Sequence, residues 1–401
     1  MNEHDAIEPA DAGAGRRFLR TFALVVALIA AAVAVVNRIA YRQMLLPENQ
    51  SIVQLVDGWS RVYKPILFDY FKPQVSVYGA SWARDAFDPA TIGPLIGLHL
   101  FNHAVSGSTP YEMRRFVESS LDDPNLKAVV LNLDTVLRPT VAVKIKYGFD
   151  EALLDTDPSG RPTLLLAARR TFATTLSGAA IGNNLEMLHA LRARDSGADV
   201  SVYIESYDHF DFAGHERDIA KLKKQLPQLA GPLPPEAAPP LSQLPVPPYA
   251  QELEKMLDGL CRLDIDIHAY FTPDLAAKAS RGRGLAETLH ALELLRRRQH
   301  GCRARLHYYN FNYPNAVTLD GLAEAERYSR YFRSDGHPRP AVGVLMAARM
   351  FRRPFPDGTP AEISADFGVD LLAVDDAETR LRDQARRVEQ LLAAVHSAGV
   401  Q

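Results

Sequence analysis

The longest uninterrupted apolar run in the chain lies near the N-terminus, at residues 22–36 (FALVVALIAAAVAVV). With its flanks it extends over residues 18–41, and about 20 helical residues are enough to cross the hydrocarbon core of a bilayer. We therefore predict an N-terminal tail over residues 1–17 and a transmembrane anchor over residues 18–41. A cleaved signal peptide is the alternative, because residues 32–34 (AVA) fit a cleavage site. The long acidic segment before the run favours a retained anchor.

The arginines that flank this run bear on its orientation. They are Arg16, Arg17 and Arg20 before it and Arg38 and Arg42 after it. The larger number before the run favours a cytoplasmic N-terminus. We therefore expect a single pass through the cytoplasmic membrane, with the rest of the chain facing the periplasm or the exterior.

Five short segments beyond residue 70 are either apolar throughout or alternate between apolar and polar residues, which is typical of β-strands. They cover residues 74–80, 97–104, 127–136, 262–271 and 303–311. Stretches with helical spacing of apolar residues lie between most of them. Alternation of strands and helices is typical of a parallel sheet covered on both faces, so we predict an α/β fold with a doubly wound parallel sheet.

Helices are indicated after the second strand and again in the C-terminal half. Thr109, Pro110 and Glu112 have the spacing of a capping box with proline in the first turn, and they predict a helix that ends near Leu121. Further helices are expected at residues 252–260, 284–299, 319–332, 339–351 and 375–397.

The interval between the third and fourth predicted strands is too long for a simple crossover connection. We assign residues 45–136 to the first part of an α/β domain, residues 137–250 to an insertion or lid, and residues 251–360 to the second part. Residues 361–401 form a C-terminal helical segment. Within the insertion, residues 227–248 are rich in proline, which predicts an extended surface loop and not a helix.

The composition narrows the classes of function. The 401 residues include 45 Lys and Arg against 48 Asp and Glu, for a formal net charge of -3, so no positive field favours a nucleic-acid partner. The two cysteines, Cys261 and Cys302, are too few for a disulfide-dense scaffold or a four-thiolate zinc site. Each stands directly before an arginine that opens a predicted strand. The thiols therefore either pair at one edge of the sheet or remain two buried free thiols.

Candidate chemistry gathers where three of the predicted strands end. Ligands of open parallel sheets bind at this carboxyl edge, and a glycine there lets a backbone N–H approach a substrate oxygen. The residues concerned are Ser81 after the first strand, Asn102 at the end of the second and Gly107 after it, and Asn132 and Asp134 in the third. Far downstream, His337 stands before the helix expected at 339–351.

Three segments, in this order, resemble the conserved blocks of the SGNH (GDSL-like) hydrolase superfamily. The resemblance is closest to its membrane-anchored extracytoplasmic members, which are tied to cell-envelope polymers and O-acyl transfer. The segments are YGASWARDAFDP with Ser81, NHAVSGSTPYE with Gly107 and SDGHPRPAVG with His337, and the resemblance covers about residues 70–136 and 260–352. It implies a flavodoxin-like, SGNH-type sheet and a serine esterase or O-acyltransferase that acts on an envelope glycan or lipid.

The resemblance also implies roles for single residues. Ser81 would be the nucleophile, His337 the base that takes its proton, and Asp335 the acid that orients the imidazole. The backbone N–H groups of Ser81 and Gly107 would hold the oxyanion. Asn132 and Asn102 are the candidates for a further amide donor. No metal or other cofactor is implied, and the implied partners are the membrane and an acyl donor or envelope glycan.

Two positions depart from the family pattern. Asp134 stands where the family usually has an asparagine that donates to the oxyanion, and an ionised carboxylate only accepts hydrogen bonds. The family's acid usually lies three residues before the histidine, where this chain has Ser334, whereas Asp335 lies two residues before it, as in some envelope O-acetyltransferases. An alternative therefore stays open: a non-catalytic binding or assembly module of the cell envelope, with envelope proteins as partners.

Overall fold

A computed structural model provides the structure of the chain. It describes residues 12–46, 49, 60–137, 143–146, 148–154, 156–157, 161–176, 178–197, 240–274, 285–318, 330–332 and 337–397. Most of the proline-rich stretch lies outside the described residues, as do Ser334 and Asp335. Residues 319–329 of the helix expected at 319–332 also lie outside them, and its expected end at 330–332 is wrong, because Phe332 forms an antiparallel bridge with Pro338.

The described residues form one sheet of five parallel strands in the order β2-β1-β3-β4-β5. The strands are β1 (Val75–Tyr78), β2 (Leu100–Asn102), β3 (Ala128–Asn132), β4 (Asp266–Phe271) and β5 (Arg305–Asn310). The five strands expected from the sequence are therefore confirmed, with shorter limits.

The expected strand at 127–136 is wrong beyond Asn132, because Leu133–Leu137 forms the short helix α7. The side chain of Asn132 explains the change of direction. Its Oδ1 accepts hydrogen bonds from the backbone N–H of Thr135 at 3.2 Å and from the Thr135 hydroxyl at 2.9 Å. Such local bonds from an asparagine favour a turn over a continued strand.

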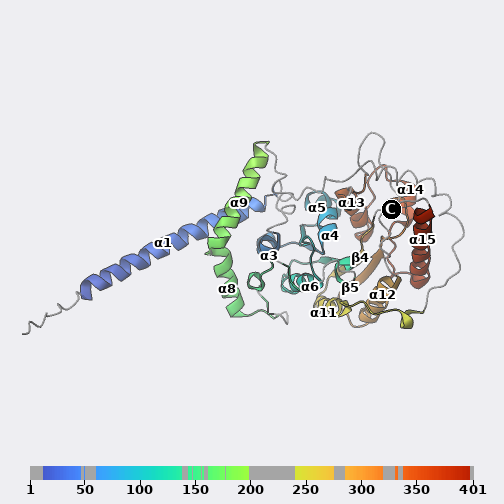
Figure 1. Cartoon of the computed structure of the whole chain (residues 1–401), viewed down its shortest axis with the longest axis horizontal. Helices are drawn as coiled ribbons and strands as arrows, with labels where there is room; N and C mark the ends of the chain where they lie inside the picture. Colours follow the sequence, from blue (N-terminus) through green and yellow to red (C-terminus); the bar gives the residue numbers. More distant parts are fainter. Residues whose placement is uncertain are drawn as a thin grey trace, which may run out of the picture.

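Helices cover both faces of the sheet, and the buried strands alternate their side chains between two apolar clusters. Val129 and Leu131 of β3 pack into one cluster, whereas Val130 packs into the other. The first cluster lies under α6 (Pro110–Glu118), α11 (Ala250–Leu260), α12 (Leu285–Gln299) and α15 (Ala377–Ser397). The second lies under α4 (Ser81–Ala86), α5 (Pro89–Ile96), α13 (Pro340–Met350) and α14 (Ala361–Asp366). Figure 1 shows α4, α5 and α13 gathered together at one side of the strands.

The capping box predicted for α6 is present. The backbone N–H of Glu112 donates to the Thr109 hydroxyl at 3.1 Å, and the backbone N–H of Thr109 donates to Glu112 Oε2 at 3.2 Å. The helix ends at Glu118 and not at Leu121, and Ser119 is its C-cap.

A long helix, α1 (Ala12–Met44), projects away from the sheet and its helices (Figure 1). It contains an apolar stretch long enough to cross a membrane, and a signal sequence satisfies the same criterion. Its C-terminal end packs with α3 (Ser60–Phe71), α8 (Leu164–Thr175) and α9 (Gly178–Asp195) around a small apolar cluster that includes Tyr41 and Met44. The insertion thus contributes two helices that rest on α1 and α3.

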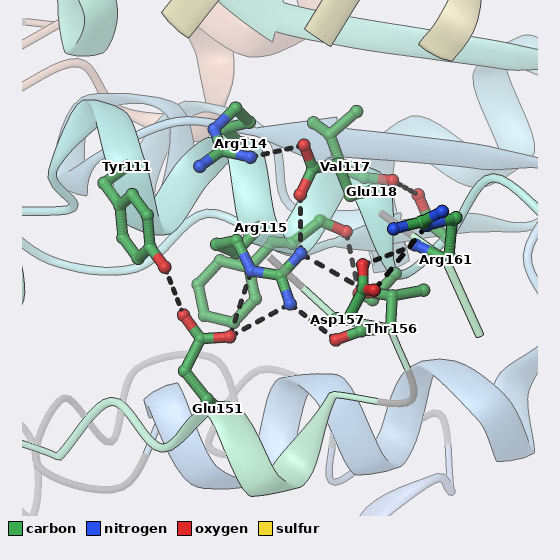
Figure 2. A network of polar contacts seen from close by, with 12 residues as sticks. Tyr111, Arg114, Arg115, Val117, Glu118, Glu151, Thr156, Asp157 and Arg161 are labelled. Carbon is green, nitrogen blue, oxygen red and sulfur yellow. Dashed lines mark hydrogen bonds and ion pairs between the residues drawn. The ribbon is translucent and has the colours of Figure 1, made fainter. Parts of the chain in front are cut away.

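A buried arginine ties the start of the insertion to α6 (Figure 2). The guanidinium of Arg115 donates to Glu118 at 2.5 Å, to Glu151 at 3.0 Å and to the Thr156 carbonyl at 2.6 Å. Tyr111 donates to the second oxygen of Glu151 at 2.6 Å. Burial, together with this hydrogen bond, raises the pKa of Tyr111 to about 12, so the phenol keeps its proton at neutral pH. The short helix η1 (Glu151–Leu153) is held against the domain by these contacts.

Cys261 and Cys302 form a disulfide. Cys261 is the C-cap of α11, and Cys302 lies in the turn before β5. The strands begin at Asp266 and Arg305, a few residues after the arginines that were expected to open them. The two turns are nevertheless side by side, because the backbone N–H of Arg303 donates to the Cys261 carbonyl at 2.8 Å. Of the two alternatives that the sequence left open, the pair is the one that forms.

We predict that replacing both cysteines by serine lowers the free energy of unfolding by about 4 kcal/mol, because the bond closes a loop of 41 residues in the unfolded chain. Urea unfolding of the full chain in detergent measures the loss. Wild-type protein treated with reductant serves as the matched sample and is expected to unfold at the same midpoint as the variant. Two titratable thiols in denatured, unreduced wild-type protein would contradict the pairing.

Candidate active site

Ser81 lies at the turn that follows β1. The strand ends at Tyr78, and Ser81 is the first residue of α4. Its side chain is half-buried and stands at the carboxyl edge of the sheet, where open α/β sheets bind ligands. The N-cap of α4 is Ala80, whose side chain offers no capping bond, so the first N–H groups of the helix are not capped from that position.

His337 reaches this serine from a distant part of the chain. Its Nε2 lies 2.9 Å from the Ser81 Oγ, although 256 residues separate the two. For Nε2 to accept the hydroxyl proton, the neutral imidazole must carry its own proton on Nδ1. The ring of Trp82 stands edge-on to the imidazole, at 6.1 Å between centroids. A histidine nitrogen within hydrogen-bond reach of a serine hydroxyl is the arrangement that activates a serine nucleophile.

The residues that follow His337 are held by contacts with residues 331–332 and by the packing of α13. Pro338 forms an isolated antiparallel β-bridge with Phe332, and the backbone N–H of Arg339 donates to the Tyr331 carbonyl at 2.8 Å. Three residues after His337, α13 begins and packs across α4 and α5. This packing needs a residue without a side chain, because a Cβ at Gly343 would overlap the Ala86 carbonyl of α4. The close contact between α13 and α4 therefore sets the distance between histidine and serine.

The turn after β2 runs beside the serine turn. The backbone N–H of Val105 donates to the Gly79 carbonyl at 3.2 Å, which brings residues 104–107 next to the turn that holds Ser81. Gly107 adopts a φ of 54°, a left-handed conformation that glycine accepts without strain. Ser81, His337 and the Gly107 turn are thus brought to one edge of the sheet.

Three buried cations hold the turn at residues 104–107. Lys64 donates to the Ala104 carbonyl, Arg61 donates to the Ser106 carbonyl at 2.7 Å, and Arg84 donates to the Ser106 hydroxyl at 2.5 Å. Arg84 belongs to α4 and also pairs with Asp85 at 2.8 Å. These hydrogen bonds from buried cations to carbonyl and hydroxyl oxygens make the turn rigid.

A further cation lies against Gly107. Glu112 pairs with Arg61 at 3.1 Å, and its other oxygen accepts the backbone N–H of Lys146 at 2.5 Å. This bond sets the position of Lys146, whose ammonium group lies so close to Gly107 that a Cβ there would overlap it. The half-buried Lys146 therefore places a positive charge beside the backbone of the Gly107 turn.

The amide groups of Asn102 and Asn132 are committed to other contacts. Asn102 donates to the carbonyls of α4 and its C-cap, at 2.9 Å for Arg84 and 2.8 Å for Phe87. Asn132 donates to the Thr272 hydroxyl at 2.6 Å and to Asp134 at 3.2 Å. Both amides tie the strands to the turns, and neither has its N–H₂ directed at a vacant position.

Asp134 has a structural contact of its own. Its Oδ2 accepts the backbone N–H of Thr272 at 2.7 Å, directly after β4. Its carboxylate is thereby partly satisfied by the neighbouring strand. Ser334 and Asp335, the two candidates for the acid behind His337, lie outside the described residues.

His103 does not offer a second base. It lies among the rings of Phe68, Tyr78, Phe101 and Phe116. Burial, with a contribution from the charge of Lys64, lowers the pKa of His103 well below its usual range, so its ring is neutral. Its place is in the core between β2 and α6.

Arg61, Lys64, Arg84 and Lys146 were not expected from the sequence. Lys64 stands in an otherwise largely apolar stretch (VYKPILF), and Arg84 lies three residues after Ser81, so both carried a weak signal. Lys146 carried none, because its place depends on a contact with Glu112 across 34 residues.

Comparison of the chain with protein-family models, with curated proteins and with solved structures finds no significant match.

We predict that Gly343→Ala lowers the free energy of unfolding by about 2 kcal/mol, because the new methyl group meets backbone atoms of α4 that cannot move aside. Gly182→Ala is the matched control, since it also lies within a helix but a Cβ there has no neighbour within 4 Å. The control is expected to be neutral or to stabilise slightly. Equal stabilities of the two variants in urea unfolding would show that α13 does not need the close contact.

Proposed function

We propose that the chain is a membrane-anchored serine esterase or O-acyltransferase that acts on an acyl ester of a cell-envelope glycan or lipid. The observation that carries the proposal is the 2.9 Å contact between Ser81 Oγ and His337 Nε2. Two unrelated turn residues, far apart in the sequence, have little reason to meet in this geometry at the carboxyl edge of a sheet. The strand order also supports an SGNH-type sheet, because the order 2-1-3-4-5 is one of the two common orders of doubly wound folds.

In the proposed reaction, Ser81 Oγ attacks the acyl carbonyl carbon while His337 Nε2 takes the hydroxyl proton. The carbonyl oxygen becomes an oxyanion. The intermediate then expels the alcohol, which receives the proton from His337, and leaves the acyl group on Ser81. Water or an acceptor hydroxyl next gives its proton to His337 and attacks the acyl-enzyme. The bond between the acyl carbon and Ser81 Oγ then breaks, and His337 returns the proton to the serine oxygen. Hydrolysis and transfer differ only in which hydroxyl enters at this last step.

The oxyanion would be held by the backbone N–H groups of Ser81 and Gly107 together with the ammonium group of Lys146. An amide donor, as the family has, would need a vacant N–H₂ group, and those of Asn102 and Asn132 are committed. Lys146 lies beside Gly107, where a positive charge favours the developing negative charge. In this account, Lys146 compensates for the carboxylate at position 134.

Two features support a site outside the cytoplasm. The disulfide between Cys261 and Cys302 is typical of oxidising compartments. The apolar stretch of α1 fits a single membrane span, with more arginines before it than after it. An enzyme held in this way would meet substrates of the envelope, and the insertion beside the site would select among them.

A non-catalytic binding module is the second candidate, because Asp134 stands where the family has an oxyanion donor. The Asp134 carboxylate instead accepts a hydrogen bond from the Thr272 backbone. In such a protein the contact between Ser81 and His337 would be a structural one. Turnover by a Ser81 variant separates the two candidates.

We predict that Ser81→Ala removes turnover of 4-nitrophenyl acetate, by about 10³-fold or to the rate of the protein-free control, because the nucleophile is lost. The free energy of unfolding should change by less than about 0.5 kcal/mol, since one small polar group outside the core is removed.

Ser364→Ala is the matched control, because that exposed serine lies on α14, where its hydroxyl donates to the Ala361 carbonyl of the same helix. It is expected to retain wild-type turnover. If Ser81→Ala and Ser364→Ala hydrolyse the ester equally well, the nucleophile is assigned wrongly and the binding module is favoured.

We predict that Lys146→Met lowers kcat about 10²-fold and leaves KM nearly unchanged, because the charge would act on the oxyanion and not on the bound ester. Lys127→Met, at the opposite edge of the sheet, controls for the loss of a positive charge. Steady-state kinetics with the same ester measure both variants. A kcat for Lys146→Met equal to that of Lys127→Met would exclude Lys146 from the reaction.

A further inference from the structure

The helix α8 leaves a broad apolar face uncovered. Its Leu164, Leu165 and Phe172 are 92%, 79% and 61% exposed, and Leu176 at its C-cap is 38% exposed. At 100° per residue these four side chains fall within one third of the helix circumference. None of the α8 side chains is fully buried.

The opposite side of α8 is the one that packs on the protein. Arg170 pairs with Asp69 at 2.5 Å and donates to the Pro65 carbonyl of α3 at 2.7 Å. Ala173 packs against the small cluster formed by α1, α3 and α9. The apolar face is therefore not a side of the helix that the described domain covers.

The level at which α8 crosses α1 is set by two hydrogen bonds. Asn37 Nδ2 donates to the Thr175 carbonyl at 2.9 Å, and the Tyr41 hydroxyl donates to the Thr174 carbonyl at 3.0 Å. Asn37 also accepts a hydrogen bond from Asn184 of α9 at 2.8 Å. Asn37 is the first polar residue after the apolar run at 22–36. If α1 spans a bilayer, α8 lies where the hydrocarbon core meets the headgroups.

The orientation of α8 suits this position. Figure 1 shows α8 and α9 running across the end of α1, so a bilayer crossed by α1 would lie along these two helices. The C-terminal end of α8 contacts α1, and both helices carry exposed apolar side chains. Arg169, at the margin of the apolar face, is exposed and could reach anionic headgroups.

We infer that α8 is an interfacial helix that lays its apolar face on the bilayer which α1 spans. This inference rests on the proposed membrane anchor and is independent of the acyl-transfer chemistry. The contact with α1 favours lipid over a protein partner, because the two helices meet at the end of the apolar span. A second membrane contact would stop the domain from swinging about the single helix and would fix its height above the lipid surface.

The test uses single cysteines labelled with bimane in the full chain. Because the two native cysteines form a disulfide, an introduced thiol is the only one that reacts without reductant. Leu165→Cys and Phe172→Cys report on the apolar face. Ala167→Cys, exposed on another side of the same helix, is the matched control, and Leu28→Cys reports on the span of α1. The proteins are placed in nanodiscs of phosphatidylcholine and phosphatidylglycerol, with or without lipids that carry a nitroxide quencher in the acyl chain.

We expect nitroxide lipid to quench the labels at positions 165 and 172 at least about twofold more strongly than the label at 167, and to quench position 28 as well. Quenching at 28 without an excess at 165 and 172 over 167 would overturn the role of α8 and leave the anchor intact. Lack of quenching at 28 would overturn both. A blue shift at 165 and 172 that is insensitive to nitroxide lipid would show that protein, such as a second copy of the chain, covers the face, and would also overturn the inference.

Discussion

Because all five strands run in the same direction, the turns that follow β1, β2 and β3 leave the sheet at a single edge. This constraint places Ser81 beside the Gly107 turn before any side chain makes a contact. The remaining partner, His337, comes to the same edge through α13, whose packing on α4 depends on Gly343. The candidate site is therefore a property of the sheet direction and of one close contact between two helices.

The positive side chains around the site have two roles: three of them hold the turn at residues 104–107, and the fourth is the one that the proposed mechanism uses. Arg61, Lys64 and Arg84 are buried and donate to oxygens of residues 104–106, so they fix the turn. Glu112 links this set to the backbone of Lys146. The Lys146 ammonium beside Gly107 is the positive group that the proposed mechanism uses. Rigid surroundings matter here, because a preorganised charge costs no rearrangement when the oxyanion forms.

The sequence predicted the parts of this structure that depend on local pattern. The apolar runs at all five strands and the capping box at Thr109 are local signals, and they are confirmed. The end of β3 was missed because Asn132 turns the chain through a side-chain contact with Thr135. The order of three motif segments predicted Ser81, Gly107 and His337 as a site, and the structure brings Ser81 and His337 into contact. Lys146 could not be found, since no pattern near it indicates that Glu112 would hold its backbone.

The central claim is that Ser81 is a nucleophile made reactive by His337. Its most direct test is reaction of the full chain with a fluorophosphonate probe, followed by intact mass and peptide mapping. The account predicts one adduct per chain, on the peptide that contains Ser81, and a strongly reduced adduct in His337→Gln, because the base that activates the hydroxyl is lost. Absence of any adduct, an adduct on another residue, or equal labelling of His337→Gln would contradict it.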